Sequence, residues 1–160
     1  MIGFNDLAIL NKYRRECKLY MFDLDDCIAF ITNKSAKKLA DEFNRRLQEN
    51  GTTRVQWIAL FYIGKAGEIS QKELSDYMDI KESSMVRLID RMEKEELVER
   101  RKDSEDRRIT KIILTDKGKF LKEELMPRGQ EFQDDVLKGI SKENLEIFKE
   151  VLQRMIDNIC

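Results

Sequence analysis

Four polar side chains between positions 83 and 91 could do chemistry together, because helical spacing places them on one face. These residues are Ser83, Ser84, Arg87 and Arg91. The apolar residues between them, which repeat at i, i+3, i+4 and i+7, are Met85, Leu88, Ile89 and Met92. Hydroxyls reach base edges or phosphates, and an arginine can bind guanine through two hydrogen bonds. The pattern predicts a helix from about position 81 that packs one face on a core and offers the other to a DNA major groove.

Elements on both sides must hold this helix in place. Ser70 and Glu73 form a capping-box pattern that starts a short helix over 71–78, and a tight turn at 79–80 leads into the next helix. Behind it, 97–102 and 108–115 read as two strands, joined by the turn residues of 103–106. The order predicts a helix-turn-helix followed by a two-stranded ribbon, which is a winged helix-turn-helix.

Long amphipathic helices are expected at both ends of the chain. One covers about 23–49 and ends at Asn50 and Gly51, and an apolar helix capped by Thr52 or Thr53 follows over about 55–67. A helix over about 116–138 should be kinked or split by Pro127, and a final helix follows Ser141. Either the terminal helices pack on each other within one chain, or they join two copies in a C2 homodimer, which we favour.

The predicted fold class is therefore mainly α with a small β-wing. A winged helix-turn-helix is flanked by long N- and C-terminal dimerisation helices in a single domain, 1–160. Within it, 1–50 forms an N-terminal arm and dimerisation helix, 51–118 the DNA-binding region, and 119–160 the C-terminal dimerisation helices.

Composition excludes several classes of function. The 160 residues carry a net charge of -1, so any DNA contact must rest on a local basic patch. Histidine is absent, which removes the commonest metal ligand and general base, and we expect no enzyme, metal or cofactor. The longest apolar run, 57–63, is far below the roughly 20 residues of a membrane helix, and the first residues do not resemble a signal peptide. The expected location is the cytoplasm.

Three stretches carry a resemblance to a known family. They are RLIDRMEKEELVER at 87–100, DSEDRR at 103–108 and ILTDKG at 113–118. Together with the order of helices over about 25–159, they resemble the MarR-type (multiple antibiotic resistance regulator) winged-helix transcriptional regulators. The resemblance implies a homodimeric regulator, expected to be a repressor, on a pseudo-palindromic operator in double-stranded DNA. It also implies a crevice that responds to a small molecule or an oxidant.

The resemblance, the polar helix face and the basic ribbon together predict a set of DNA contacts. The set is Ser70, Gln71, Lys72, Lys81, Ser83, Ser84, Arg87, Arg91, Arg101, Lys102, Arg107 and Arg108. Arg107 would reach a minor groove from the tip of the wing, while Asp106 and Arg108 would mainly hold the wing in shape. Val86 stands where the family often has Ser or Thr, so its contact would be apolar, to a thymine methyl group.

Two further sites stay open at this point. Phe30, Trp57, Phe61 and Tyr62 could line the effector crevice, although aromatic residues at helical spacing are also typical of a core. Cys27, in the first half of the long helix, could sense oxidants, although the neighbouring acidic residues disfavour a reactive thiolate.

A different class of function remains an alternative. The near-neutral charge favours a winged helix that binds protein without specific DNA binding. That function requires an exposed apolar patch on the helix, which Met85 could supply only if its face of the helix were not core.

Overall fold

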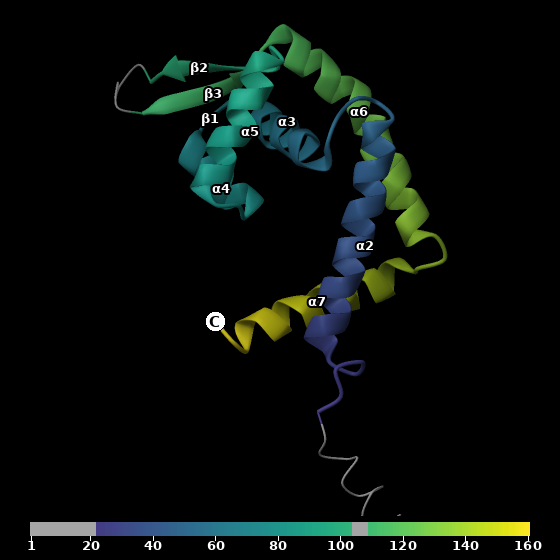
Figure 1. Cartoon of the computed structure of the whole chain (residues 1–160). Helices are drawn as coiled ribbons and strands as arrows, with labels where there is room; N and C mark the ends of the chain where they lie inside the picture. Colours follow the sequence, from purple (N-terminus) through teal and green to yellow (C-terminus); the bar gives the residue numbers. More distant parts are fainter. Residues whose placement is uncertain (1–21, 104–108) are drawn as a thin grey trace, which may run out of the picture. The chain divides into compact units, whose positions relative to one another are not determined.

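The chain forms a series of helices with three short strands between them, as the computed structural model shows (Figure 1). It describes residues 22–103 and 109–160, so most of the expected N-terminal arm and residues 104–108 of the expected wing lie outside the described residues. The elements are α2 (Ile28–Gln48), α3 (Arg54–Ala66), β1 (Glu68–Ser70), α4 (Gln71–Met78), α5 (Glu82–Lys94), β2 (Val98–Lys102), β3 (Thr110–Leu114), α6 (Asp116–Leu137) and α7 (Lys142–Asp157). The chain falls into two compact units, 1–42 and 43–160, which are described separately.

The first unit contains most of α2, which starts later than the sequence suggested. Positions 23–26 form a turn instead, in which the Asp23 carboxylate accepts a hydrogen bond from the Asp25 N–H (3.0 Å). An aspartate that bonds its own backbone two residues on competes with helix formation. Cys27 therefore precedes α2, and its expected place inside the helix is wrong.

The sheet of the second unit has three strands in the order β1-β3-β2, all antiparallel. The prediction of a two-stranded ribbon therefore lacked one strand. β1 also pairs with β3, with Ile69 opposite Ile112. Both side chains are buried, at 3% and 0% exposure. Three residues are too short a stretch to show strand alternation in a sequence. Pairing with β3 is what makes β1 a strand.

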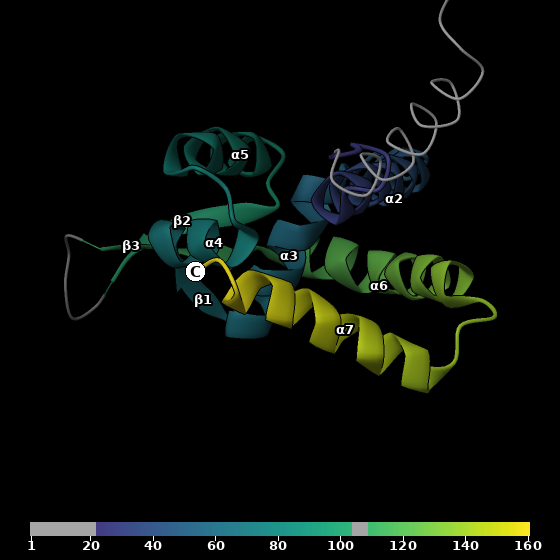
Figure 2. The ribbon, with the colours of Figure 1, turned by 90° about the horizontal axis from the view of Figure 1, so that it is seen from below.

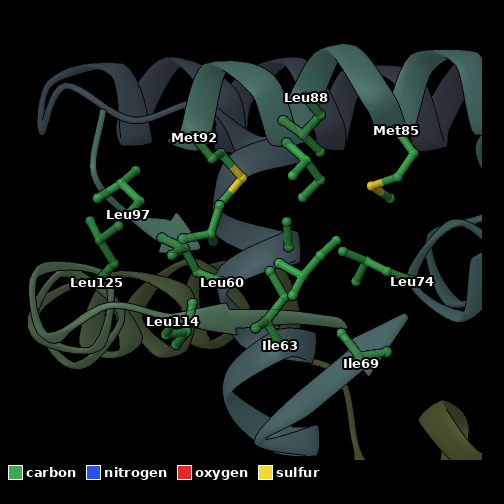
Figure 3. Close-up of a cluster of buried hydrophobic side chains, with 14 of the residues drawn as sticks. Leu60, Ile63, Ile69, Leu74, Met85, Leu88, Met92, Leu97, Leu114 and Leu125 are labelled. Carbon is green, nitrogen blue, oxygen red and sulfur yellow. The ribbon is translucent and has the colours of Figure 1, made fainter. Parts of the chain in front are cut away.

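One hydrophobic core holds α3, α4, α5 and the sheet together. Figure 3 shows Met85, Leu88 and Met92 pointing from α5 toward Leu60 and Ile63 of α3, and all five are at most 1% exposed. In Figure 2, α3, α4 and α5 gather beside the strands. The apolar stripe predicted for α5 is confirmed, as is the mainly helical fold with a winged helix-turn-helix.

The C-terminal helices begin at their predicted caps. The Thr115 hydroxyl accepts a hydrogen bond from the Gly118 N–H (3.0 Å), and the Ser141 hydroxyl accepts one from the Asn144 N–H (3.2 Å). Of the two effects expected of Pro127, a split of the first helix is wrong, since α6 continues through it, and a kink there stays a prediction. No helix in the described parts of the chain is both long and apolar enough to span a membrane.

Candidate nucleic-acid interface

Helix α5 presents its polar face to solvent. Ser83, Ser84, Arg87 and Arg91 are all exposed, opposite the buried stripe. The part of the chain that the structure describes offers no hydrogen bond or ion pair to either arginine, so both guanidinium groups remain available to a ligand. Val86, on the same helix, is 41% exposed. Two hydroxyls, two cations and one small apolar side chain thus share the outer side of α5, as the sequence predicted.

The N-terminus of α5 differs from that of the other helices in the second unit. Lys81 occupies the N-cap position with an exposed side chain, and no side chain caps the helix there. The first backbone N–H groups of a helix have no partner within it, and their dipoles favour an anion. Lys81 therefore adds a charge where a phosphate would also meet open amides.

The N-terminus of α4 is already occupied in part. The Ser70 hydroxyl accepts a hydrogen bond from the Glu73 N–H (3.1 Å), and the Glu73 carboxylate accepts one from the Ser70 N–H (2.8 Å). Hydrogen bonds from the Ser70 hydroxyl and then its backbone N–H lower the pKa of the Glu73 carboxyl. The predicted capping box is confirmed. Because the Ser70 N–H is engaged, the amides left for a phosphate in this turn are those of Gln71 and Lys72.

Adjacent arginines of β2 face opposite sides of the sheet. Arg101 pairs with Glu99 and lines a cavity of about 830 Å³ formed by the sheet, the end of α3 and the start of α6. Arg100 points the other way and pairs with Asp90 and Glu93 of α5. The side chain of Arg101 is 66% exposed, whereas that of Arg100 is only 25% exposed.

The remaining predicted contacts of the wing are Lys102, Arg107 and Arg108. Lys102 is exposed at the end of β2 and donates a hydrogen bond to the Thr110 hydroxyl (3.1 Å). Arg107, Arg108 and Asp106 lie outside the described residues, so their roles stay predictions.

Sequence reasoning missed Arg100. The signal was present, because side chains alternate across a strand and position 100 shares a face with Val98, which is apolar and packs inward. A basic run hides that alternation, since every residue from 100 to 102 carries the same charge.

The predicted effector crevice is divided between the two compact units. Phe30 belongs to the first, where the Lys34 ammonium lies 5.8 Å from its ring centroid. Trp57, Phe61 and Tyr62 lie on α3 in the second. There, ring contacts run from Phe132 of α6 through Phe43 of α2 to these three rings, and on to Tyr77 of α4. All three α3 rings are only half-buried, and the crevice stays a prediction.

The remaining candidate groups are the cysteines and the acidic residues. Cys27 is half-buried and Cys160 exposed, and both are free thiols. Within 22–103 and 109–160, no group of three or more cysteine or acidic residues is placed to hold a metal ion.

Comparisons with known proteins agree with this geometry. The family model described as "MarR family" matches residues 50–109. The chain is 34% identical over 109 residues to the uncharacterized HTH-type transcriptional regulator YsmB of Bacillus subtilis (strain 168), covering 68% of this chain and 75% of that relative.

Solved structures share the fold. Mutant MarR from E. coli complexed with operator DNA is similar at a TM-score of 0.75 and 21% identity, covering 80% of this chain and 92% of that one. BpsR of Bordetella bronchiseptica, whose DNA binding is regulated by 6-hydroxynicotinic acid, has a TM-score of 0.78 at 18% identity, covering 86% and 98%.

Proposed function

This chain belongs to the MarR family of HTH-type transcriptional regulators, and from that premise we propose that it is a homodimeric repressor acting in the cytoplasm. It binds a pseudo-palindromic operator in double-stranded DNA and leaves it when a small molecule binds. A dimer bound at such a site blocks transcription by occupying DNA that the polymerase needs.

The observation that carries the proposal is the two-faced α5. Its buried stripe fixes the helix on the core, so the outer face keeps a constant orientation. That face carries Arg87 and Arg91 without protein partners among the described residues, together with the hydroxyls of Ser83 and Ser84. An arginine with both edges of its guanidinium free can bind guanine O6 and N7, and hydroxyls serve bases or phosphates. We therefore assign base reading to α5.

Phosphate contacts come from the elements beside α5. The open amides of Gln71 and Lys72, and Lys81 at the start of α5, fit a role in positioning the protein on the backbone. Lys102 supplies a cation near the end of the wing, and Arg107 would extend that contact into a minor groove. Arg101 would join them only if its pairing with Glu99 yielded to a phosphate.

The C-terminal helix α7 supports a dimer. None of its residues is buried, although Ile147, Phe148 and Val151 are apolar and 50–55% exposed. A contiguous apolar face of this kind is typical of a protein interface. A second copy would cover it symmetrically, and two α5 helices would then enter successive major grooves about 34–36 Å apart.

Release by an effector is proposed from two observations. BpsR, which shares the fold, is regulated by an aromatic acid. In this chain, half-buried aromatic rings of α3 lie between α6 and α4, so a molecule bound beside them would contact both the dimerisation and the DNA-binding parts. Such a molecule weakens operator binding only if it binds more tightly to a form of the dimer in which the two α5 helices are wrongly spaced for the operator.

The protein-binding alternative lacks its main requirement. Met85 was the residue that could supply an apolar patch on α5, and it is fully buried.

The test measures binding of fluorescent duplexes, enriched by the wild type from a random pool, as a function of salt. Arg87→Ala should cost about 1–3 kcal/mol on the best duplex and relax preference at one base pair. If Arg87 meets only phosphate, all duplexes should weaken alike and the salt slope should fall by about 0.9. Lys138→Ala is the matched control, because it removes an exposed cation at the far end of α6. Absence of any sequence-selective complex at low salt would overturn the proposal in favour of a protein partner.

A further inference from the structure

Arg100 is held between the wing and α5 by two carboxylates. Its Nη2 lies 2.6 Å from Asp90 Oδ1, and its Nη1 donates to Glu93 Oε2. Asp90 and Glu93 are three residues apart and so lie one above the other on the surface of α5. The planar guanidinium has donors on both edges, so it can bridge two acids one turn apart, which a lysine ammonium cannot do in the same way.

The pairing register determines that Arg100 faces α5. Arg100 lies opposite Ile112 of β3, and Val98 lies opposite Leu114. Val98, Ile112 and Leu114 are all buried, so this is the inner face of the sheet. Arg100 extends from that face beyond the apolar core, to the second half of α5. It therefore ties β2 to the helix that we propose reads DNA.

The contact between Arg100 and Asp90 also changes the net charge beside the exposed polar face of α5. Asp90 follows Arg87 by one turn of α5, and its side chain is 51% exposed. A carboxylate close to DNA repels phosphate. Asp90 would exert this repulsion in the second half of α5, where Arg91 should attract phosphate. Because Arg100 pairs with both Asp90 and Glu93, the three side chains together carry one negative charge instead of the two of the carboxylates alone.

We propose that Arg100 is a positioning residue for DNA recognition, which acts through Asp90 and Glu93 and does not itself contact DNA. It fixes the angle between β2 and α5 and offsets one of the two negative charges that Asp90 and Glu93 place on α5. The inference rests on the proposed function, because it concerns how the same surface is prepared for DNA.

The test is a double-mutant cycle on operator affinity with Arg100→Gln and Asp90→Asn. Arg100→Gln should weaken binding about tenfold, since it removes charge-assisted hydrogen bonds and leaves Asp90 unopposed. Asp90→Asn in that background restores the net charge and should recover a large part of the loss. In the wild-type background, the same substitution breaks the contact and should not strengthen binding. Such non-additivity is the signature of a direct coupling.

Each other outcome identifies what is wrong. If Asp90→Asn strengthens binding equally in both backgrounds, and Arg100→Gln lowers the salt slope by about 0.9, Arg100 contacts phosphate and the inference fails. Unchanged affinity of folded Arg100→Gln, even with a lower melting temperature, would show a merely structural contact and would also overturn it. Arg128→Ala is the control, because it removes an exposed arginine that is paired within α6, with Glu131, and not with α5. If the wild type binds no duplex selectively, the proposed function itself fails.

Discussion

Replacing Gly118 with alanine should destabilise the protein strongly, because a backbone carbonyl occupies the space that a Cβ needs. A Cβ at position 118 would lie 2.0 Å from the Leu97 carbonyl oxygen and 3.0 Å from its carbonyl carbon. The obstacle cannot rotate away as a side chain would. The Leu97 N–H donates to the Met92 carbonyl (2.8 Å), and its own carbonyl accepts from the Thr115 N–H (3.2 Å). Relief of the clash must therefore separate the start of α6 from the turn that joins α5 to β2.

The expected cost follows from this geometry. Overpacking of a core site costs about 1–3 kcal/mol, and a fixed backbone obstacle places Gly118→Ala near the upper end, about 3 kcal/mol. For a chain of this length, that corresponds to a fall in melting temperature of roughly 6–12 °C. Urea unfolding followed by circular dichroism measures the free energy directly. Protein concentration must be equal for all variants, because dimerisation would otherwise shift the midpoint.

Gly64→Ala provides the matched control. Its Cβ would also meet neighbours, with Lys122 Cδ at 2.7 Å and Leu114 Cδ1 at 3.1 Å, but both atoms belong to side chains, which can move as a backbone carbonyl cannot. Alanine also favours the helix interior by up to about 1 kcal/mol over glycine. We expect stability within about 1 kcal/mol of the wild type. Equal stability of the two alanine variants would refute the argument that the Leu97 carbonyl fixes the approach of α6.

Three other changes follow from contacts already described. Trp57→Phe should lower the free energy of unfolding by about 1 kcal/mol through the lost hydrogen bond alone, because the indole N–H donates to the Leu125 carbonyl (3.3 Å). Equal urea midpoints for the variant and the wild type would contradict this. Glu73→Gln should reduce the acid sensitivity of unfolding: the folded pKa of Glu73 lies below its unfolded value, so its contribution is present above about pH 4.5 and is lost as the pH falls through the folded pKa. Identical pH profiles from pH 6 to 3 would count against it. Phe148→Ser should shift sedimentation toward the monomer and leave the packing within one chain intact, since the ring is 55% exposed there, and an unchanged dimer would place the interface elsewhere.

The elements that could be read from the sequence are those set by neighbours a few residues apart. The buried stripe of α5 follows from helical spacing, and the starts of α4, α6 and α7 follow from Ser70, Thr115 and Ser141 acting as caps. The predicted start of α2 was wrong, although its cause is also local: the turn at Asp23 competes with helix formation. The wing-tip contact of Arg107 and the effector crevice stay predictions.

Contacts between distant parts of the chain needed the tertiary structure. The sequence by itself determined that a two-faced helix follows a capped helix and precedes a basic strand, because periodicity and capping are local. It could not decide that Arg100 pairs with acids on α5 while Arg101 faces away from that helix, since both carry the same charge and stand side by side. Nor could it show that β1 completes the sheet or that Gly118 touches Leu97. Strand register and helix approach settle these points, because they bring together backbone groups and charges that lie far apart along the chain.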